Sequence, residues 1–275
     1  MRTDDPAPVV LSRQSNGTGV PVVLLPPAAT RGEVWNAHQV PALVSAGYRV
    51  VVANHRGLAP SPAPQGPYRL ADVVADAAQL IEDLGQGPCH VVGASLGAFV
   101  AQELAAARPE LVRSAVLLGT RARTDHYRRS LARALAARAR AAGPVTDAEV
   151  VAHLGQLFGP LTLGDDRRVS DWMELLKRFP VSGPGPAAQY ELTAIPDRRQ
   201  VLAGIRRPCL VIAFALDLIS PPAFGAEVHE VIPHCGWVEL AGLGHFGFLE
   251  RPDAVNAEIL RFLAQVDAGA PLLAG

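Results

Sequence analysis

The chain has 275 residues, of which 49% are hydrophobic and 19% are charged, and its formal net charge at pH 7 is -1. This composition is sufficient for a packed globular core, and the near-zero charge argues against a nucleic-acid-binding surface, which requires a basic excess on one face. The first residues contain neither a basic nor an apolar segment and no apolar run is long enough to span a membrane, so we expect a cytoplasmic protein that binds neither nucleic acid nor membrane.

Segments typical of strands and helices alternate in the first part of the chain. Val9-Val10-Leu11 and residues 20–25 are predicted strands, and the turn-forming residues 16–19 between them predict a hairpin. Another strand is expected at residues 48–53, followed by a helix at 70–84 whose apolar residues form one stripe. This alternation predicts an α/β fold with a parallel sheet covered by helices on both faces.

The alternation stops after a predicted strand at residues 111–118. From residue 121 to about residue 196 the pattern is helical and is interrupted by Gly-Pro pairs. The later predicted elements are strands at 209–214 and 237–240 and a helix at 254–266.

This interruption predicts a discontinuous core with an inserted unit rather than two tandem domains. We assign residues 1–119 and 197–275 to the core and residues 120–196 to a helical cap. The arginines between residues 121 and 140 are expected to form a solvated helix face, with contact to an acidic substrate or a carrier protein as the alternative.

A serine lies at the break between a predicted strand and a predicted helix. Gly93-Ala94-Ser95-Leu96-Gly97 is the only G-x-S-x-G pentapeptide in the sequence. A turn this tight strains the backbone of its central residue and requires very small residues at the two glycine positions. The Ser95 hydroxyl is thereby held out at the top of the sheet. A serine hydroxyl is a poor nucleophile until a base removes its proton, so a histidine and an acid are needed as well.

Both partners follow predicted strands. Asp217 comes just after the strand at 209–214, and His245 comes shortly after the strand at 237–240. Because the carboxyl ends of parallel strands meet at one edge of a sheet, these residues are expected to converge with Ser95. The sequence therefore predicts Ser95 as nucleophile, His245 as general base and Asp217 as the acid that orients His245.

At these positions the chain resembles the α/β-hydrolase family over nearly its whole length. The motifs that carry the resemblance are Gly93-Ala94-Ser95-Leu96-Gly97, Asp217 before Ile219-x-Pro221, and Gly244-His245 followed by Glu250-x-Pro252, in the family's order of serine, acid and histidine. The resemblance implies a mostly parallel sheet of about eight strands with a helical cap inserted after the sixth. The Asn54-His55-Arg56-Gly57 loop and the acid segment also resemble bacterial esterases and cyclase-like hydrolases of polyketide pathways.

The resemblance further implies an oxyanion hole made by two backbone N–H groups, one of them that of Leu96. The other comes from the loop after the strand that ends at Leu25. Here this loop is Pro26-Pro27-Ala28-Ala29, where the family usually has His-Gly. Proline has no N–H to donate, whereas Ala28 aligns with the usual donor. We therefore expect Ala28 and Leu96 to form the hole, and loss of either donor to cost ~3 kcal/mol of transition-state stabilisation.

Together these features predict a serine hydrolase that cleaves an ester, lactone or thioester of a small apolar molecule through an acyl-enzyme. Two alternatives remain open. The first is an acyltransferase or cyclase of a biosynthetic pathway on the same scaffold, in which a bound nucleophile outcompetes water. The second is a ligand-binding module that keeps the fold and turns over slowly. Product analysis separates the first alternative from hydrolysis, and robust ester turnover would exclude the second.

The sequence predicts neither a cofactor nor a metal ion. His229 and His234 have no partners at ligand spacing, and the Gly242-x-Gly244-x-x-Gly247 pattern is not followed by a βαβ unit. Cys89, Cys209 and Cys235 are too few and too scattered for a disulfide framework and are expected to be structural. The expected partner is a small-molecule substrate, and a homodimer is left open.

Overall fold

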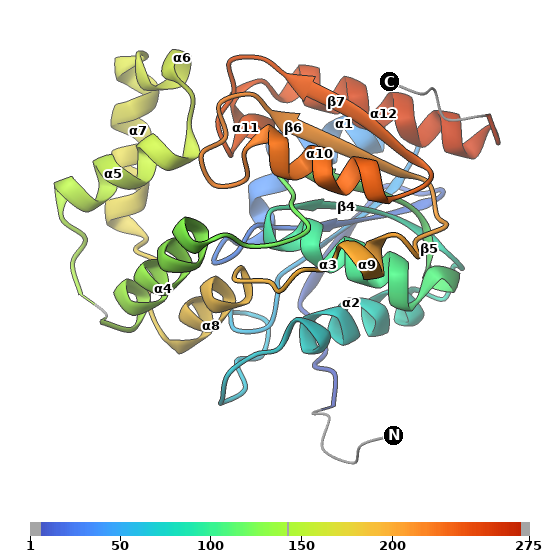
Figure 1. Cartoon of the computed structure of the whole chain (residues 1–275), viewed down its shortest axis with the longest axis horizontal. Helices are drawn as coiled ribbons and strands as arrows, with labels where there is room; N and C mark the ends of the chain where they lie inside the picture. The colour runs from blue at the N-terminus through green and yellow to red at the C-terminus, as the bar shows by residue number, and fades with distance from the viewer. Residues whose placement is uncertain (1–6, 142, 271–275) are drawn as a thin grey trace.

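A seven-stranded sheet runs through the centre of the protein in the computed structural model, which describes residues 7–141 and 143–270 (Figure 1). The strand order is β1-β3-β2-β4-β5-β6-β7, and all neighbouring strands are parallel except β1 and β3. The strands are β1 Arg13–Asn16, β2 Pro21–Leu25, β3 Arg49–Ala53, β4 Cys89–Ala94, β5 Val112–Leu118, β6 Cys209–Phe214 and β7 Cys235–Leu240. The predicted mostly parallel sheet is confirmed, with seven described strands rather than about eight.

Helices cover both faces of this sheet, as predicted. Apolar residues of α2, α3, α9 and α10 form one core with the first face, and those of α1 and α12 form a second core with the other. The core helices are α1 Gln39–Ser45, α2 Leu70–Leu84, α3 Leu96–Ala107, α9 Arg199–Leu202, α10 Pro222–Val231, α11 Gly247–Glu250 and α12 Pro252–Asp267, with short 3-10 helices at Gly32–Trp35 and Pro109–Leu111. Among residues 7–141 and 143–270, no helix is both long and apolar enough to cross a bilayer.

The predicted N-terminal hairpin is wrong. Strand β1 pairs with β3 in antiparallel register, whereas β2 lies between β3 and β4 and is parallel to both. Burial explains this order, because Pro21–Leu25 is apolar and fully buried whereas Arg13–Asn16 is polar and exposed throughout. A buried apolar strand belongs in the middle of a sheet and a polar strand at its edge. Val9-Val10-Leu11 forms no strand.

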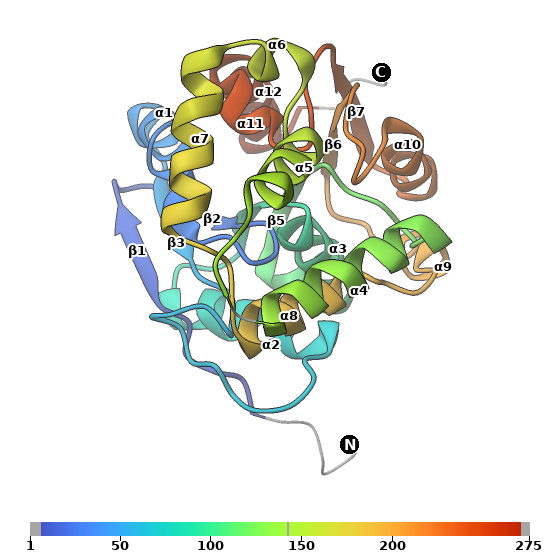
Figure 2. The ribbon, with the colours of Figure 1, turned by 90° about the vertical axis from the view of Figure 1, so that its left-hand side faces the viewer.

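The chain between β5 and β6 is helical, and it includes the residues 120–196 expected to form the cap. Its helices stand at one end of the sheet, in front of the strands in the view of Figure 2. Helix α4 packs against α8, and α5 packs against α7. The five helices described within residues 120–196 are α4 His126–Ala141, α5 Asp147–Leu157, α6 Pro160–Leu163, α7 Asp166–Arg178 and α8 Pro184–Leu192. This layer lies over the edge of the sheet at which Ser95 is found.

Candidate active site

Ser95 lies in the sharp turn that joins β4 to α3. Its backbone has φ 52° and ψ -114°, a strained conformation for a residue other than glycine. A Cβ on Gly93 would lie 2.2 Å from the carbonyl oxygen of Gly97, and one on Gly97 would lie 2.1 Å from the carbonyl oxygen of Leu25. The backbone segments therefore touch at both glycines, and no larger residue fits at either position. The Ser95 N–H donates to the Leu118 carbonyl at 3.0 Å, which holds the turn against β5.

Asp217 and His245 form a hydrogen-bonded pair at the ends of the neighbouring strands. The Nδ1–H of His245 donates to Oδ2 of Asp217 at 2.6 Å. The other carboxylate oxygen of Asp217 accepts the N–H groups of Ile219 and Ser220 at 2.8 and 2.7 Å. Both members of the pair are buried. Because a carboxylate can only accept, Nδ1 carries the proton and Nε2 is left as the proton acceptor.

The turn at the end of β5 leaves room for this pair. Gly119 has φ +54°, and a Cβ at this position would lie 3.2 Å from Oδ2 of Asp217 and 3.2 Å from Nδ1 of His245. A side chain at residue 119 would thus press on the hydrogen bond between the acid and the histidine.

A cavity of about 1230 Å³ opens over the carboxyl ends of the strands, and Ser95, His245 and Ala28 all line it. Asp217 lies behind His245, and Leu96 begins α3 directly after Ser95. Much of the wall is apolar and comes from both the core and the helical layer, including Leu131, Leu135, Trp172, Leu176, Phe246 and Leu249. The Ser95 hydroxyl makes no hydrogen bond within the described part of the chain.

In the segment Pro26-Pro27-Ala28-Ala29 after β2, only the N–H of Ala28 is left without an acceptor among the described residues. Pro26 and Pro27 have none, and the N–H of Ala29 donates to Oε1 of Gln189 at 2.7 Å. The N–H groups of Ala28 and Leu96 have no acceptor among residues 7–141 and 143–270. Two unpaired donors thus belong to the residues expected to form the oxyanion hole.

Glu250 fixes the loop that carries His245. Its buried carboxylate accepts the N–H of Gly244 at 2.6 Å, the N–H of Gly159 at 2.9 Å and the hydroxyl of Thr162 at 2.6 Å. One acid therefore joins the histidine loop to the helical layer. This contact gives a physical reason for Glu250 in the Glu-x-Pro motif.

Arg121 was expected on a solvated helix face, and that prediction is wrong. Its side chain is only 2% exposed and precedes α4 in the segment that follows β5. Its guanidinium donates to the hydroxyl of Ser220 at 2.9 Å and to the carbonyls of Ile219 and Thr193 at 3.2 and 2.6 Å. Burial lowers the pKa of Arg121 to about 10, while the charge of Asp217 opposes this shift. Arg121 thus joins the acid loop to the helical layer.

Two further polar side chains of the helical layer line the cavity, and no sequence motif points to either. His153 comes from α5 and Tyr190 from α8. Burial, and secondarily the charge of His245, lowers the pKa of His153. Burial raises the pKa of Tyr190 to about 12. Both groups are therefore neutral near pH 7 and offer the cavity neutral hydrogen-bonding groups. Both residues fit the amphipathic pattern of an ordinary helix, so the sequence does not distinguish them as cavity residues.

The three cysteines lie outside the cavity lining and are unpaired. Burial raises the pKa of Cys89 to about 11 and that of Cys235 to about 12, and it also raises the pKa of Cys209. Because the thiolate is the reactive form, we expect iodoacetamide at about pH 8 to change any ester turnover of the protein by less than ~2-fold. The activity that remains after treatment measures this change. Titration of the remaining thiols in denaturant is the control, because it shows how many cysteines were alkylated. Inactivation in step with alkylation would contradict the expectation.

Comparisons with known proteins agree with this arrangement. The family model described as alpha/beta hydrolase fold matches residues 20–252. A protein of Mycobacterium tuberculosis H37Rv with the provisional name non-heme bromoperoxidase BpoC is 40% identical over 262 residues, covering 94% of this chain and 99% of the relative. Its crystal structure has a TM-score of 0.88 at 38% identity and covers 94% of this chain and 97% of that chain.

Two further relatives are more distant. A protein of Azorhizobium caulinodans with the provisional name carbamate hydrolase RutD is 29% identical and covers 92% of this chain and 94% of the relative. The crystal structure of the enol-lactonase of Burkholderia xenovorans LB400 has a TM-score of 0.81 at 27% identity, with coverage of 92% and 96%. By sequence, by fold and by the match of the family model over most of its length, the chain belongs to the α/β-hydrolase family.

Proposed function

We propose that this protein is a serine hydrolase that cleaves an ester, lactone or thioester of a small molecule. The observation that carries the proposal is the 2.6 Å hydrogen bond between Asp217 and His245 at a cavity that Ser95 also lines. The relatives named carbamate hydrolase and enol-lactonase support hydrolysis as the class of reaction. We further propose that residues 120–196 act as a cap that shapes the substrate cavity.

The proposed reaction has two halves. Nε2 of His245 takes the proton of Ser95, whose Oγ attacks the carbonyl carbon, and the N–H groups of Ala28 and Leu96 stabilise the resulting oxyanion. Collapse of this intermediate breaks the bond to the leaving group, which receives the proton from His245, and leaves an acyl-enzyme. Water then gives a proton to Nε2 of His245 and attacks the acyl carbon. Collapse of this second intermediate breaks the bond to Oγ of Ser95, which takes that proton from His245 as the acid is released. Asp217 holds His245 in the required tautomer and stabilises its charged form.

Turnover of a panel of nitrophenyl esters in water enriched in oxygen-18 tests this proposal. Hydrolysis places one labelled oxygen in the released acid, because water attacks the acyl-enzyme. Transfer of the acyl group to an added alcohol in place of water would favour the acyltransferase alternative. Tight ligand binding without turnover would favour a binding module. Peroxide-dependent bromination without ester turnover would instead favour an activity like the one in the name of the mycobacterial relative.

The charges of the cavity favour substrates with a negative group. Its charged lining residues are Arg31, Arg121, Arg128, Arg168, Arg178, Glu33 and Glu250. Arginines thus predominate here, although acidic and basic residues are nearly balanced in the whole chain. Neither Arg31 nor Arg178 has an ion-pair partner in the part of the chain that the structure describes. Both are free to meet an anionic group at the cavity.

We therefore expect the double variant Arg31→Gln, Arg178→Gln to raise the KM for a nitrophenyl monoester of glutaric acid by about 3- to 10-fold, since each exposed charge pair contributes ~0.2–1 kcal/mol. The KM for neutral nitrophenyl butyrate should stay unchanged. Steady-state kinetics with both esters measures the difference. Arg261→Gln, which removes an exposed charge on α12 outside the cavity, is the matched control. Equal changes for the two esters would show that the arginines do not select for charge.

A further inference from the structure

Gln189 of α8 connects two loops that are distant in the sequence. Its side chain is fully buried. Oε1 accepts the N–H of Ala29 at 2.7 Å, and Nε2 donates to the carbonyl of Arg56 at 2.7 Å. One amide side chain therefore satisfies a donor in the loop after β2 and an acceptor in the loop after β3. The first of these loops contains Ala28, the proposed oxyanion donor.

Helix α8 is pressed directly against the loop after β3. A Cβ on Gly185 would lie 2.0 Å from the carbonyl oxygen of Gly57, and a Cβ on Gly57 would lie 2.9 Å from Cα of Gly185. Gly57 also has φ +91°, which favours glycine. This backbone contact fixes the start of α8 four residues before Gln189. The amide of Gln189 is thus held in place by its own helix.

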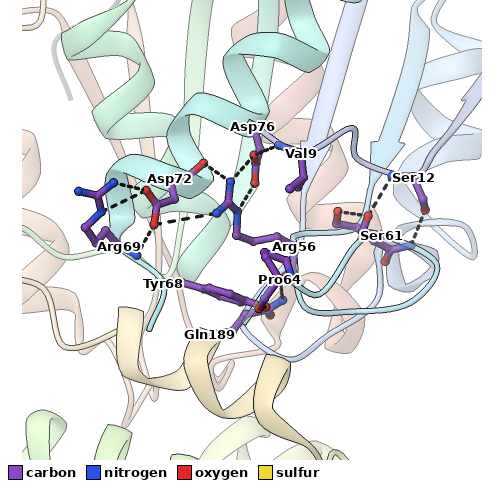
Figure 3. A network of polar contacts seen from close by, with 11 residues as sticks. Val9, Ser12, Arg56, Ser61, Pro64, Tyr68, Arg69, Asp72, Asp76 and Gln189 are labelled. Atoms are coloured by element: carbon purple, nitrogen blue, oxygen red, sulfur yellow. Dashed lines mark hydrogen bonds and ion pairs between the residues drawn. The ribbon is translucent and has the colours of Figure 1, made fainter. Parts of the chain in front are cut away.

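The acceptor that Gln189 uses is rigid as well. The guanidinium of Arg56 donates from Nε and Nη2 to the two carboxylate oxygens of Asp76, each at 2.6 Å, and its Nη1 lies 4.0 Å from Asp72 (Figure 3). All three side chains are buried. Figure 3 shows Gln189 reaching from α8 to this residue. A buried ion pair of this geometry is costly to break, because each charge would be left without its partner.

The loop after β2 depends on such outside support. Two of its residues are prolines, and Thr30 supplies its internal hydrogen bonds: the N–H donates to the carbonyl of Pro27 at 3.3 Å, which closes a turn, and the hydroxyl donates to the carbonyl of Ala28 at 3.2 Å. Ala29, the third residue of this turn, has φ 55°, where glycine is the usual residue. An alanine in this conformation costs ~1–3 kcal/mol and persists only when its surroundings hold it. The bond from the Ala29 N–H to Gln189 is such a restraint.

We propose that Gln189 is a positioning residue, which holds the peptide between Ala28 and Ala29 so that the Ala28 N–H stays directed at the oxyanion. This inference rests on the proposed function of Ser95. Without Gln189, rotation of that peptide would relax the strain at Ala29 and move the adjacent Ala28. An oxyanion donor acts fully only when it is already in place as charge develops. The helical layer would then contribute to catalysis by fixing backbone geometry in the core.

The test compares Gln189→Met with Gln189→Glu. Methionine has a similar length and no hydrogen bonds, whereas glutamate can still accept the N–H of Ala29. For nitrophenyl butyrate we expect Gln189→Met to lower kcat by about 10- to 100-fold, less than the ~10²–10³-fold effect of deleting a donor outright. KM should change by less than ~3-fold, since the substrate carbonyl uses the hole weakly before attack. Gln189→Glu should retain more kcat than Gln189→Met.

A trifluoromethyl ketone, which forms an oxyanion on serine, gives a second measurement. Its inhibition constant should rise with Gln189→Met by the same factor by which kcat falls, whereas a purely structural role would not link the two. Glu191→Gln on the same helix, which removes only an exposed ion pair with Arg140, is the matched control and should leave both values unchanged. Urea unfolding confirms that each variant is folded. If Gln189→Met does not fold, kcat and the inhibition constant are measured for Gln189→Glu instead. Both values are then expected to lie between those of wild type and those of a protein that lacks one oxyanion donor.

Two results would overturn the inference. One is a folded Gln189→Met protein with the kcat of wild type, or, where only Gln189→Glu folds, an unchanged kcat for that variant. The other is a fall in kcat without any change in inhibition by the ketone. A wild-type protein that hydrolyses no ester would instead contradict the proposed function itself, so the two failures are distinguishable.

Discussion

Replacing Ser95 with alanine is expected to lower kcat/KM for nitrophenyl esters by at least ~10⁴-fold, because the variant has no nucleophile to form the acyl-enzyme. The protein should still fold, since the Ser95 hydroxyl makes no hydrogen bond within the described residues that the variant would lose. Steady-state kinetics of purified wild type and variant give the ratio. The variant should retain only the rate acceleration that the oxyanion hole and substrate binding provide without a nucleophile.

Ser182→Ala is the matched control for this experiment. Ser182 is exposed and lines the same cavity, but it lies in the loop before α8 rather than in the turn after β4. We expect it to keep its activity within ~2-fold, as surface substitutions usually do. If Ser95→Ala kept a tenth or more of the wild-type rate, another group would have to be the nucleophile.

Asp217→Asn should have the second largest effect, a fall in kcat of about 10⁴-fold. The oxygen of an asparagine can still accept the N–H groups of Ile219 and Ser220, as Oδ1 of the acid does. Its NH₂ group would then face Nδ1 of His245, where a carboxylate oxygen now accepts the hydrogen bond of Nδ1–H. The imidazole would take the other tautomer, with its proton on Nε2, and could not accept the proton of Ser95.

Kinetics at saturating ester measure this loss, and the downfield proton signal of Nδ1–H should disappear from the NMR spectrum of the variant. Asp197→Asn removes a carboxylate that pairs with Arg199 at the surface and serves as control. A variant Asp217→Asn within 10-fold of wild type would mean that another acid orients His245.

The sequence was most informative where geometry follows from topology. Parallel strands bring their carboxyl ends to one edge, so the places of Ser95, Asp217 and His245 after three strands predicted that they would converge, and Asp217 does reach His245 beside a cavity lined by Ser95. The G-x-S-x-G spacing predicted a turn that only glycine tolerates, and both glycines touch backbone. These predictions needed only the order of elements and the size of residues.

The hairpin prediction is wrong because a local turn does not decide which strands pair, whereas burial does. Residues 16–19 favour a turn, but the polar strand β1 and the apolar strand β2 pair with opposite sides of β3 and not with each other. Gln189 and Arg121 were missed for a related reason. Each side chain forms hydrogen bonds with segments that are far away in the sequence, and no local sequence pattern predicts such partners. The hydrogen bond from Gln189 to the loop that contains Ala28 could therefore be recognised only from the three-dimensional structure.

Labelling with a fluorophosphonate, followed by peptide mass spectrometry, tests the role of Ser95 most directly. The reagent forms a covalent bond only with an activated serine and needs no knowledge of the natural substrate. We predict one adduct per chain, located on Ser95, with loss of ester turnover in proportion to labelling and no adduct on Ser95→Ala. An adduct on another residue, or unlabelled protein that still hydrolyses esters, would contradict the assignment of Ser95 as the nucleophile.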